Sequence, residues 1–283
     1  MNKTGIEYVD RTWNPITGCF HDCPYCYARG IARRFGTQGI NTTDVFQGSV
    51  HEAGTVVLHE PYIRDGNAQP YPFGFAPTFH RYRLTEPENE KKPQRIFVGS
   101  MADMFGKWVP DEWIQAVFDA CAAAPWHTYL FLTKNPERYY QVNNDDDETT
   151  NLTLHDTPAL FGATVTNNDE MERAYESLID WVSIEPLHGR ISKEWFMYNM
   201  CTDSFEGPAD GEIARWAWVV IGAETGNRRD KIKPERTWIE EIVETCRFWG
   251  TPVFMKDNLV DVWGDALIQE YPWEEGHHGP DSR

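Results

Sequence analysis

Short runs of apolar, β-branched and aromatic residues recur along the chain, with polar turns and helical patterns between them. Each run is almost continuously apolar, which is typical of strands buried on both faces of a parallel sheet. The pattern predicts an N-terminal strand near residues 11–16 and later strands at residues 95–100, 128–133, 160–166, 181–185, 216–222 and 252–256.

Helical periodicity fills several intervals between these strands. Residues 111–123 begin with two acidic residues, carry apolar residues at helical spacing and end before Pro125. Residues 168–179 and 234–249 show the same spacing, and Gly250 directly follows the second of these segments. Strands that alternate with helices predict βαβ units with right-handed crossovers. About seven such units predict an α/β fold, namely a full or partial (β/α) barrel. An open doubly wound sheet is the alternative.

Two segments depart from this alternation. Residues 37–93 are rich in glycine, proline, aromatic and charged residues, and they predict an irregular insertion with a short strand near residues 79–84. Residues 143–150 (NNDDDETT) predict an acidic, solvated loop without a calcium site. The chain is therefore predicted to form one barrel domain over residues 1–258. A C-terminal extension with a mobile tail follows at residues 259–283.

Composition and charge narrow the possible functions. Hydrophobic residues make up 41% of the chain and charged residues 25%, which is an ordinary globular composition. The net charge of −18 argues against wrapping duplex DNA, because an acidic surface repels phosphates. No apolar stretch approaches the roughly 18–20 residues of a membrane helix, and the N-terminus lacks a secretory pattern. These features predict a cytoplasmic protein with no membrane partner.

Three of the six cysteines stand together as Cys19, Cys23 and Cys26, with the spacing C-x3-C-x2-C and Tyr25 before the last. A disulfide scaffold spreads its cysteines through a short secreted chain, so this triplet favours a metal site in a reducing compartment. Three thiolates can take three corners of a 4Fe-4S cube and leave one iron open. Zinc is the alternative, but it needs a fourth ligand, and His21 lies too close for the common zinc spacings.

The triplet resembles the signature of the radical S-adenosylmethionine (radical SAM) superfamily, including the aromatic residue before the last cysteine. Phrases elsewhere are similar to a phage-associated family of radical SAM-like proteins of poorly defined function. They stand at residues 12–19 (TWNPITGC), 96–103 (IFVGSMAD), 131–134 (FLTK), 182–186 (VSIEP) and 220–224 (VIGAE). The similarity thus extends from about residue 5 to residue 258, which is most of the chain.

The resemblance implies an enzyme that uses a 4Fe-4S cluster to cleave S-adenosylmethionine reductively. The 5′-deoxyadenosyl radical so formed abstracts hydrogen from a substrate, and a reductant such as flavodoxin or ferredoxin supplies the electron. The compartment would be the cytoplasm, that of the host if a phage encodes the chain. A nucleobase or nucleotide is the preferred substrate, because the family has phage associations and the sequence resembles a radical SAM enzyme of DNA repair. The alternatives are an enzyme that modifies peptides or proteins and a non-enzymatic zinc-binding phage accessory protein.

Functional side chains of such barrels stand at the carboxyl ends of the strands. With the metal on Cys19, Cys23 and Cys26, the resemblance assigns cofactor binding to Tyr25, Ser100, Met101, Asp103, Thr164, Thr166 and Glu185. It assigns the substrate to Glu224, Lys134 and Lys256. Superfamily members often carry Gly-Gly-Glu where this chain has Gly-Ser-Met at residues 99–101, so the chain departs from the pattern at Ser100. Each carboxylate or lysine also has a structural alternative, because it can hold a turn or pair with an opposite charge.

Overall fold

The computed structural model describes residues 1–36, 55–143, 152–154, 156–200, 215–226 and 228–273. The predictions of an acidic loop at residues 143–150 and of a mobile tail fall almost wholly outside this part of the chain. None of the helices in these ranges is both long and apolar enough to span a bilayer.

The largest sheet has eight strands in the order β1-β2-β8-β9-β12-β13-β14-β15. Strands β2, β8 and β9 pair in parallel, as do β12, β13, β14 and β15, whereas β1 runs antiparallel to β2. Among the described residues, no pairing joins the two outer strands of this sheet. The predicted parallel α/β architecture is thus confirmed, whereas closure into a full barrel is not seen. The eight strands are β1 (Asn2–Lys3), β2 (Arg11–Trp13), β8 (Arg95–Val98), β9 (Thr128–Thr133), β12 (Ala159–Thr164), β13 (Trp181–Ile184), β14 (Trp218–Ile221) and β15 (Val253–Met255).

The chain divides into two compact units, Met1–Leu160 and Phe161–Arg283, and the boundary falls within β12. The prediction of one domain over residues 1–258 stays a prediction, because a compact unit is not by itself an independent domain. Each unit is described separately below.

The first unit adds a small three-stranded sheet and several helices to its part of the large sheet. The small sheet has the order β3-β7-β4, formed by β3 (Ile16–Thr17), β7 (Thr78–His80) and β4 (Val56–Leu58). The described part of the predicted insertion is therefore partly regular. A strand, β7, does lie near the predicted residues 79–84, but it ends at His80 and a 3-10 helix follows at Arg81–Arg83. The remaining elements are α1 (Tyr27–Phe35), β5 (Ile63–Arg64), β6 (Asn67–Ala68), η1 (Arg81–Arg83), α2 (Glu86–Asn89), α3 (Asp111–Ala122), η2 (Pro136–Gln141), β10 (Val142–Asn143) and β11 (Leu152–Thr153).

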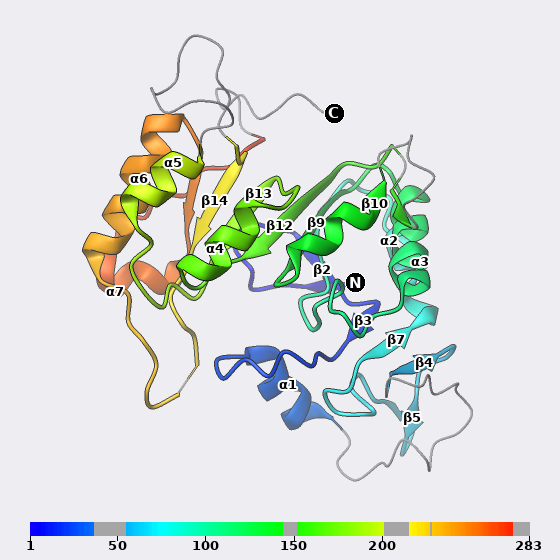
Figure 1. Cartoon of the computed structure of the whole chain (residues 1–283). Helices are drawn as coiled ribbons and strands as arrows, with labels where there is room; N and C mark the ends of the chain where they lie inside the picture. Colours follow the sequence, from blue (N-terminus) through cyan, green and yellow to red (C-terminus); the bar gives the residue numbers. More distant parts are fainter. Residues whose placement is uncertain (37–54, 144–151, 155, 201–214, 227, 274–283) are drawn as a thin grey trace. The chain divides into compact units, whose positions relative to one another are not determined.

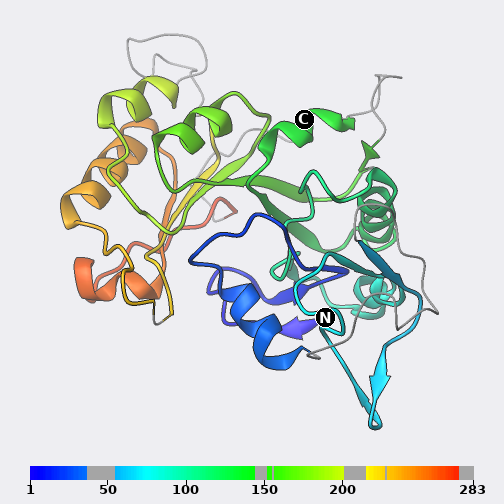
Figure 2. The same ribbon diagram turned by 60° about the horizontal axis from the view of Figure 1, so that its bottom comes forward.

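The β5–β6 hairpin, drawn in cyan, extends away from the rest of the first unit (Figure 2). Its residues are exposed, as expected for a two-stranded ribbon that has no apolar face to bury.

The second unit carries its helices on the four strands from β12 to β15. The helices are α4 (Asn168–Tyr175), α5 (Lys193–Asn199), α6 (Arg236–Trp249) and α7 (Val260–Trp263), with a 3-10 turn η3 (Asp257–Leu259) before the last. Helices α5 and α6 lie side by side (Figure 1). Helix α6 ends at Gly250, whose φ of 69° is the left-handed cap expected there. Helix α4 ends at Tyr175, before the predicted residue 179, and Leu178 beyond it is exposed.

Aromatic side chains make up much of the core, which accounts for their abundance. The fully buried aromatic residues include Trp13, Trp113, Trp181, Trp216 and Trp218. All four residues of β13 and all four of β14 are buried, as the continuous apolar runs predict. This packing fixes the strands, and therefore the loops at their carboxyl ends, in place.

Candidate functional site

The clustered cysteines lie on the loop that joins β3 to α1 in the first unit. Their side chains are half-buried, and all three are free thiols. Two of the sulfur atoms already accept backbone hydrogen bonds. The N–H of His21 donates to Cys19 Sγ at 3.4 Å, and the N–H of Arg29 donates to Cys26 Sγ at 3.4 Å. Cys26 thereby caps the N-terminus of α1.

At the start of the loop, the backbone of Gly18 and Cys19 packs directly against the backbone of other segments. The N–H of Gly18 donates to the carbonyl of Met101 at 2.9 Å, and the N–H of Cys19 donates to the carbonyl of Phe75 at 3.1 Å. Gly18 has φ 87°, and a Cβ at this position would lie 2.3 Å from the carbonyl oxygen of Ala76. Glycine is therefore required here by both backbone conformation and space.

Replacing Gly18 by alanine is expected to lower the free energy of unfolding by about 2–4 kcal/mol, because it adds backbone strain to a collision with main chain. Gly30 is the matched control, since a Cβ there meets no atom within 4 Å and the residue lies in α1. Gly30→Ala should leave stability unchanged or raise it. Urea denaturation of both variants measures the difference, and equal stabilities would contradict the geometry.

The electrostatics of the loop keep the thiols of Cys19 and Cys23 protonated when no metal is bound. Burial and the negative charge of Asp103 raise the pKa of Cys19 to about 12, against a lowering effect of the His21 N–H. Burial also raises the pKa of Cys23, and the ammonium of Lys134 opposes this rise. A metal that binds these sulfur atoms must therefore displace protons.

A buried polar network ties the cysteine loop to the end of β9, and Asp103 is its centre. Asp103 Oδ2 lies 2.7 Å from His21 Nε2 and accepts the Lys134 backbone N–H at 3.0 Å. Asp103 Oδ1 accepts the hydroxyl of Thr133 at 2.6 Å. The side-chain amide of Asn135 lies 3.1 Å from His21 Nε2. Asp103 is only 6% exposed, so these partners take up most of what its oxygens can accept.

Lys134 places a buried charge beside the cysteine motif. Its Nζ is inaccessible to solvent and has no hydrogen-bond partner in the part of the chain that the structure describes. It lies 5.4 Å from the centre of the Tyr25 ring. A buried ammonium without a hydrogen-bonded anion is costly, so this position favours an anionic ligand.

Two further predicted residues, Ser100 and Met101, lie next to the same loop. The Asn14 side-chain oxygen accepts the Ser100 hydroxyl at 3.2 Å and the Met101 N–H at 2.9 Å. The Tyr27 hydroxyl, on the first residue of α1, donates to the Ser100 carbonyl at 2.6 Å. The structure therefore brings together the five non-cysteine residues predicted in the first unit.

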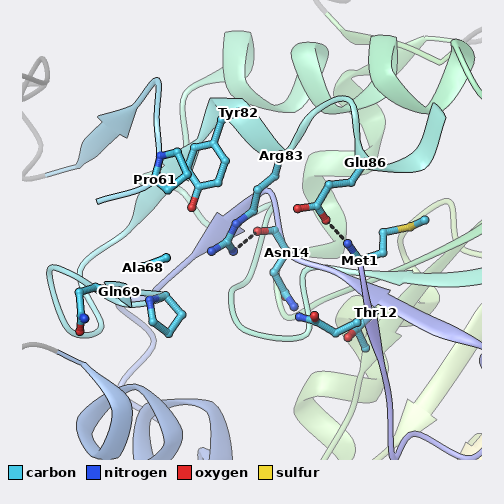
Figure 3. Close-up of a pocket in the computed structure, with 11 residues that line it drawn as sticks. Met1, Thr12, Asn14, Pro61, Ala68, Gln69, Tyr82, Arg83 and Glu86 are labelled. Carbon is cyan, nitrogen blue, oxygen red and sulfur yellow. Dashed lines mark hydrogen bonds and ion pairs between the residues drawn. The ribbon is translucent and has the colours of Figure 1, made fainter. Parts of the chain in front are cut away.

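A separate pocket of about 320 Å³ is lined by Asn14 and lies between β2 and the predicted insertion. Arg83 projects into it and donates to the Asn14 carbonyl at 2.9 Å (Figure 3). Tyr82, Glu86 and Thr12 also line it. The sequence analysis assigned none of these side chains to a site. Asn14 belongs both to this pocket and to the support of Ser100.

Most of the predicted residues of the second unit have hydrogen-bond or ion-pair partners within that unit. The N–H and hydroxyl of Thr166 both donate to Glu170 Oε2 at 2.7 Å, an arrangement that begins α4. Lys256 Nζ donates to Glu185 Oε1 at 2.8 Å, so a residue predicted for the cofactor pairs with one predicted for the substrate. Thr164 ends β12, where it is aligned with Ser183.

Glu224 is the most deeply buried carboxylate of this group. Its side chain is 1% exposed; it receives two hydrogen bonds from Arg228, at 2.6 and 2.7 Å, and lies 3.0 Å from His188 Nε2. The hydrogen bonds from Arg228 hold the pKa of Glu224 below its ordinary value, with a smaller contribution from His188. This cluster connects Glu224, after β14, with His188, after β13.

Replacing Glu224 by glutamine is expected to cost about 2 kcal/mol of stability at neutral pH, because charged hydrogen bonds are lost. A lowered folded-state pKa means that the stabilisation is present above the unfolded-state pKa, near ~4.3, and disappears as the pH falls through the folded value. The difference from wild type should therefore shrink in acid. Urea denaturation across this range tests it, with Glu241→Gln as the control, since Glu241 pairs with Arg190 at the surface and contributes under ~1 kcal/mol. A difference that is constant with pH would contradict this.

No three histidine, cysteine, aspartate or glutamate side chains in the described ranges converge on a site for a single metal ion. This holds for the three cysteines as well, so the described residues favour neither zinc nor a cluster. In a 4Fe-4S cluster each cysteine binds a different iron atom, so the sulfur atoms need not converge on one point. The assignment of Cys19, Cys23 and Cys26 to a 4Fe-4S cluster stays a prediction.

Comparison with known proteins places this site in a family. Residues 3–270 match the family described as "Protein of unknown function (DUF5131)". The chain belongs to this family. No curated protein matches the chain.

Several solved structures of spore photoproduct lyase are similar to this DUF5131 protein. A mutant of the lyase has a TM-score of 0.50 at 9% identity, over 90% of this chain and 80% of that one. A complex with dinucleoside spore photoproduct has a TM-score of 0.49 at 8% identity, over 85% and 75%. Another mutant, with bound AdoMet and dinucleoside spore photoproduct, has a TM-score of 0.41 at 9% identity, over 83% and 60%. At these identities the likeness shows a shared fold with a large, mostly parallel sheet.

Several residues of the site escaped the sequence analysis. His21 was considered only as a zinc ligand, and Thr133, Asn135 and His188 were not assigned to the site. The sequence could have indicated Thr133 and Asn135, because they stand on either side of Lys134 at the end of a predicted strand. Nothing in the sequence pairs His21 with Asp103, since 82 residues separate them.

Proposed function

We propose that this protein is a radical SAM enzyme. It holds a 4Fe-4S cluster on Cys19, Cys23 and Cys26 and binds S-adenosylmethionine at the iron that no cysteine ligates. The observation that carries this proposal is the cysteine loop itself. The loop has the superfamily spacing, and Asp103 connects it to the end of β9. The buried ammonium of Lys134 at this strand end has no hydrogen-bonded anion among the described residues. The fold shared with spore photoproduct lyase supports the proposal.

The residues present fit such a cluster by their chemistry. All three cysteines are free thiols, and two sulfur atoms accept backbone N–H bonds of the kind that stabilise cluster thiolates. The ammonium of Lys134, which has no hydrogen-bond partner among the described residues, lies close enough to oppose the rise in the pKa of Cys23. A positive charge here offsets the negative charge that three thiolates bring into a half-buried loop.

When bound, the reduced cluster supplies the electron that splits S-adenosylmethionine into methionine and a 5′-deoxyadenosyl radical. The protein's own contribution is to position the cofactor and to exclude water. Lys134 holds the cofactor carboxylate through its ammonium, a role that its place beside Cys23 favours over the substrate role given by the resemblance. Tyr25 packs beside that ammonium. Ser100 and Met101, fixed by Asn14, present strand-end backbone to the methionyl group.

The roles of the second-unit residues rest on the resemblance alone. It gives Thr164, Thr166 and Glu185 to the cofactor, and Glu224 and Lys256 to the substrate. Four of the five have the internal partners described above, so a ligand would compete with those partners or use the remaining lone pairs.

The preferred substrate is a nucleobase or nucleotide. Two of the similar lyase structures hold a dinucleoside spore photoproduct, which supports this class. The net charge of −18 favours a free nucleotide over duplex DNA. Modification of a peptide is the second possibility. Flavodoxin or ferredoxin would supply the electron, in the cytoplasm of the cell that makes the protein.

The test is anaerobic reconstitution with iron and sulfide, followed by reduction and EPR spectroscopy with and without S-adenosylmethionine. We expect a 4Fe-4S signal that changes when the cofactor is added, together with 5′-deoxyadenosine among the products. A protein that takes up zinc in preference, or a cluster whose spectrum ignores the cofactor, would overturn the proposal.

A further inference from the structure

One histidine stands inside the cysteine motif but outside every role assigned so far. His21 lies between Cys19 and Cys23, and its backbone and side chain are held in different ways. Its N–H points at Cys19 Sγ over 3.4 Å, and its Nε2 lies 2.7 Å from Asp103 Oδ2. We infer that His21 is a positioning residue whose bond to Asp103 aims its own N–H at the Cys19 sulfur, which raises the reduction potential of the cluster.

The backbone contact exists only in one conformation of a short turn. The donor is two residues after the sulfur it reaches, and the next residue, Asp22, has φ 55°. Aspartate tolerates this left-handed conformation better than most residues, but a free loop would not hold it. The ion pair of the Asp22 carboxylate with Arg29 steadies the far side of the turn. The near side depends on the His21 side chain.

That side chain is held from three directions by parts of the first unit that are remote in sequence. Its ring packs edge-on against Trp108, with 4.9 Å between ring centres. Nε2 contacts Asp103, and the Asn135 amide lies 3.1 Å from the same nitrogen. The ring is 21% exposed and the Asp103 carboxylate 8%, so water competes little for the contact. Rotating the His21 backbone would break all three contacts together.

Asp103 cannot follow such a rotation, because it is anchored independently. Its Oδ1 accepts the Thr133 hydroxyl at 2.6 Å and the Phe105 N–H at 3.1 Å. Its Oδ2 accepts the Lys134 N–H at 3.0 Å. Two of these donors, Thr133 and Lys134, lie at the end of the packed strand β9. The direction in which the His21 N–H points at Cys19 Sγ is thus set by the core of the unit, through the side chains of Asp103 and His21.

The consequence for the cluster follows from general iron–sulfur chemistry. A hydrogen bond to a ligating sulfur stabilises the more electron-rich, reduced state and so raises the reduction potential. This inference rests on the proposed function, because it needs a cluster on the three cysteines. A purely structural histidine would affect stability alone, whereas a positioning residue also affects the potential.

The experiment compares the reconstituted wild type with His21→Ala, His21→Gln and His127→Ala, each titrated by EPR-monitored reduction. Glutamine can place an amide nitrogen near Asp103, so it is the conservative rescue. His127 is the matched control: it is a buried histidine of the same unit, bonded to Pro87 and Gln94 and placed in no part of the site. Iron content and urea stability are measured for each variant.

We expect a lower midpoint potential in His21→Ala, partial recovery in His21→Gln, and a wild-type potential in His127→Ala despite its lower stability. An unchanged potential in His21→Ala would overturn the inference while leaving the proposed function intact. If His21→Ala holds no cluster, Thr133→Val decides, because it loosens Asp103 from a distance. A lowered potential supports the inference, and an unchanged one overturns it. A wild type without any cluster would overturn the proposed function, and the inference with it.

Discussion

Replacing Cys23 by alanine is expected to abolish cluster binding and 5′-deoxyadenosine formation together, while the protein stays folded. Two thiolates cannot hold a cube that three are needed to anchor, so the iron content should fall from about four per chain to well below one. Cys23 is half-buried in a loop, so the loss of its side chain leaves the core intact. Iron analysis, EPR and product chromatography on the anaerobic protein measure the three effects.

Cys121→Ala is the control for this change. Cys121 is a completely buried thiol on α3 and packs as a small apolar side chain. Its loss should cost about 1 kcal/mol of stability and leave the iron content unchanged. If Cys23→Ala kept its cluster, or if both variants lost it equally, the three-cysteine assignment would fail.

Replacing Lys134 by methionine is expected to change stability and binding in opposite directions. Methionine keeps most of the side-chain volume but removes a buried ammonium that has no hydrogen-bond partner among the described residues. The metal-free protein should therefore become more stable, by about 1 kcal/mol. Affinity for S-adenosylmethionine should fall roughly 10- to 100-fold, because a charged hydrogen bond is lost. Urea denaturation and equilibrium dialysis measure the two effects.

Lys256→Met gives the matched comparison. Lys256 donates to Glu185 at 2.8 Å, so its removal leaves a partly buried carboxylate without that partner. This variant should lose stability, whereas Lys134→Met gains it. If both lysines stabilised the protein to a similar extent, the ammonium of Lys134 would already be satisfied and would need no anionic ligand.

Much of the fold could be predicted from the sequence because the strands are buried on both faces. A strand such as β14 tolerates only apolar residues, so its position can be read directly from the chain. The end of α4 was harder, because Leu178 continues the apolar pattern but lies on the surface. Closure of a barrel depends on how strands far apart in sequence meet, and no local pattern carries that information.

For the candidate site, the sequence indicated which residues to consider but not what they contact. The rule that function lies at the carboxyl ends of strands was enough to find Ser100, Asp103 and Lys134, which do lie around the cysteine loop. What each of them contacts depended on tertiary structure. Asp103 was assigned to the cofactor on its position, yet it is occupied by internal donors from two other segments. The pairing of Lys256 with Glu185, 71 residues away, was equally invisible in the sequence.

The cap of α1 links metal supply to the lifetime of the protein. No acidic residue stands in the first turn of this helix, which is described in full, and its capping acceptor is the sulfur of Cys26. A thiolate bound to iron places a negative charge next to the N–H groups of the first turn, at the positive end of the helix dipole. A protonated thiol is only a weak hydrogen-bond acceptor for them. Under the proposed function, iron starvation or oxygen damage would loosen the first turn of α1. Proteases act on such locally opened backbone, so the cell would clear the empty protein faster than the loaded one.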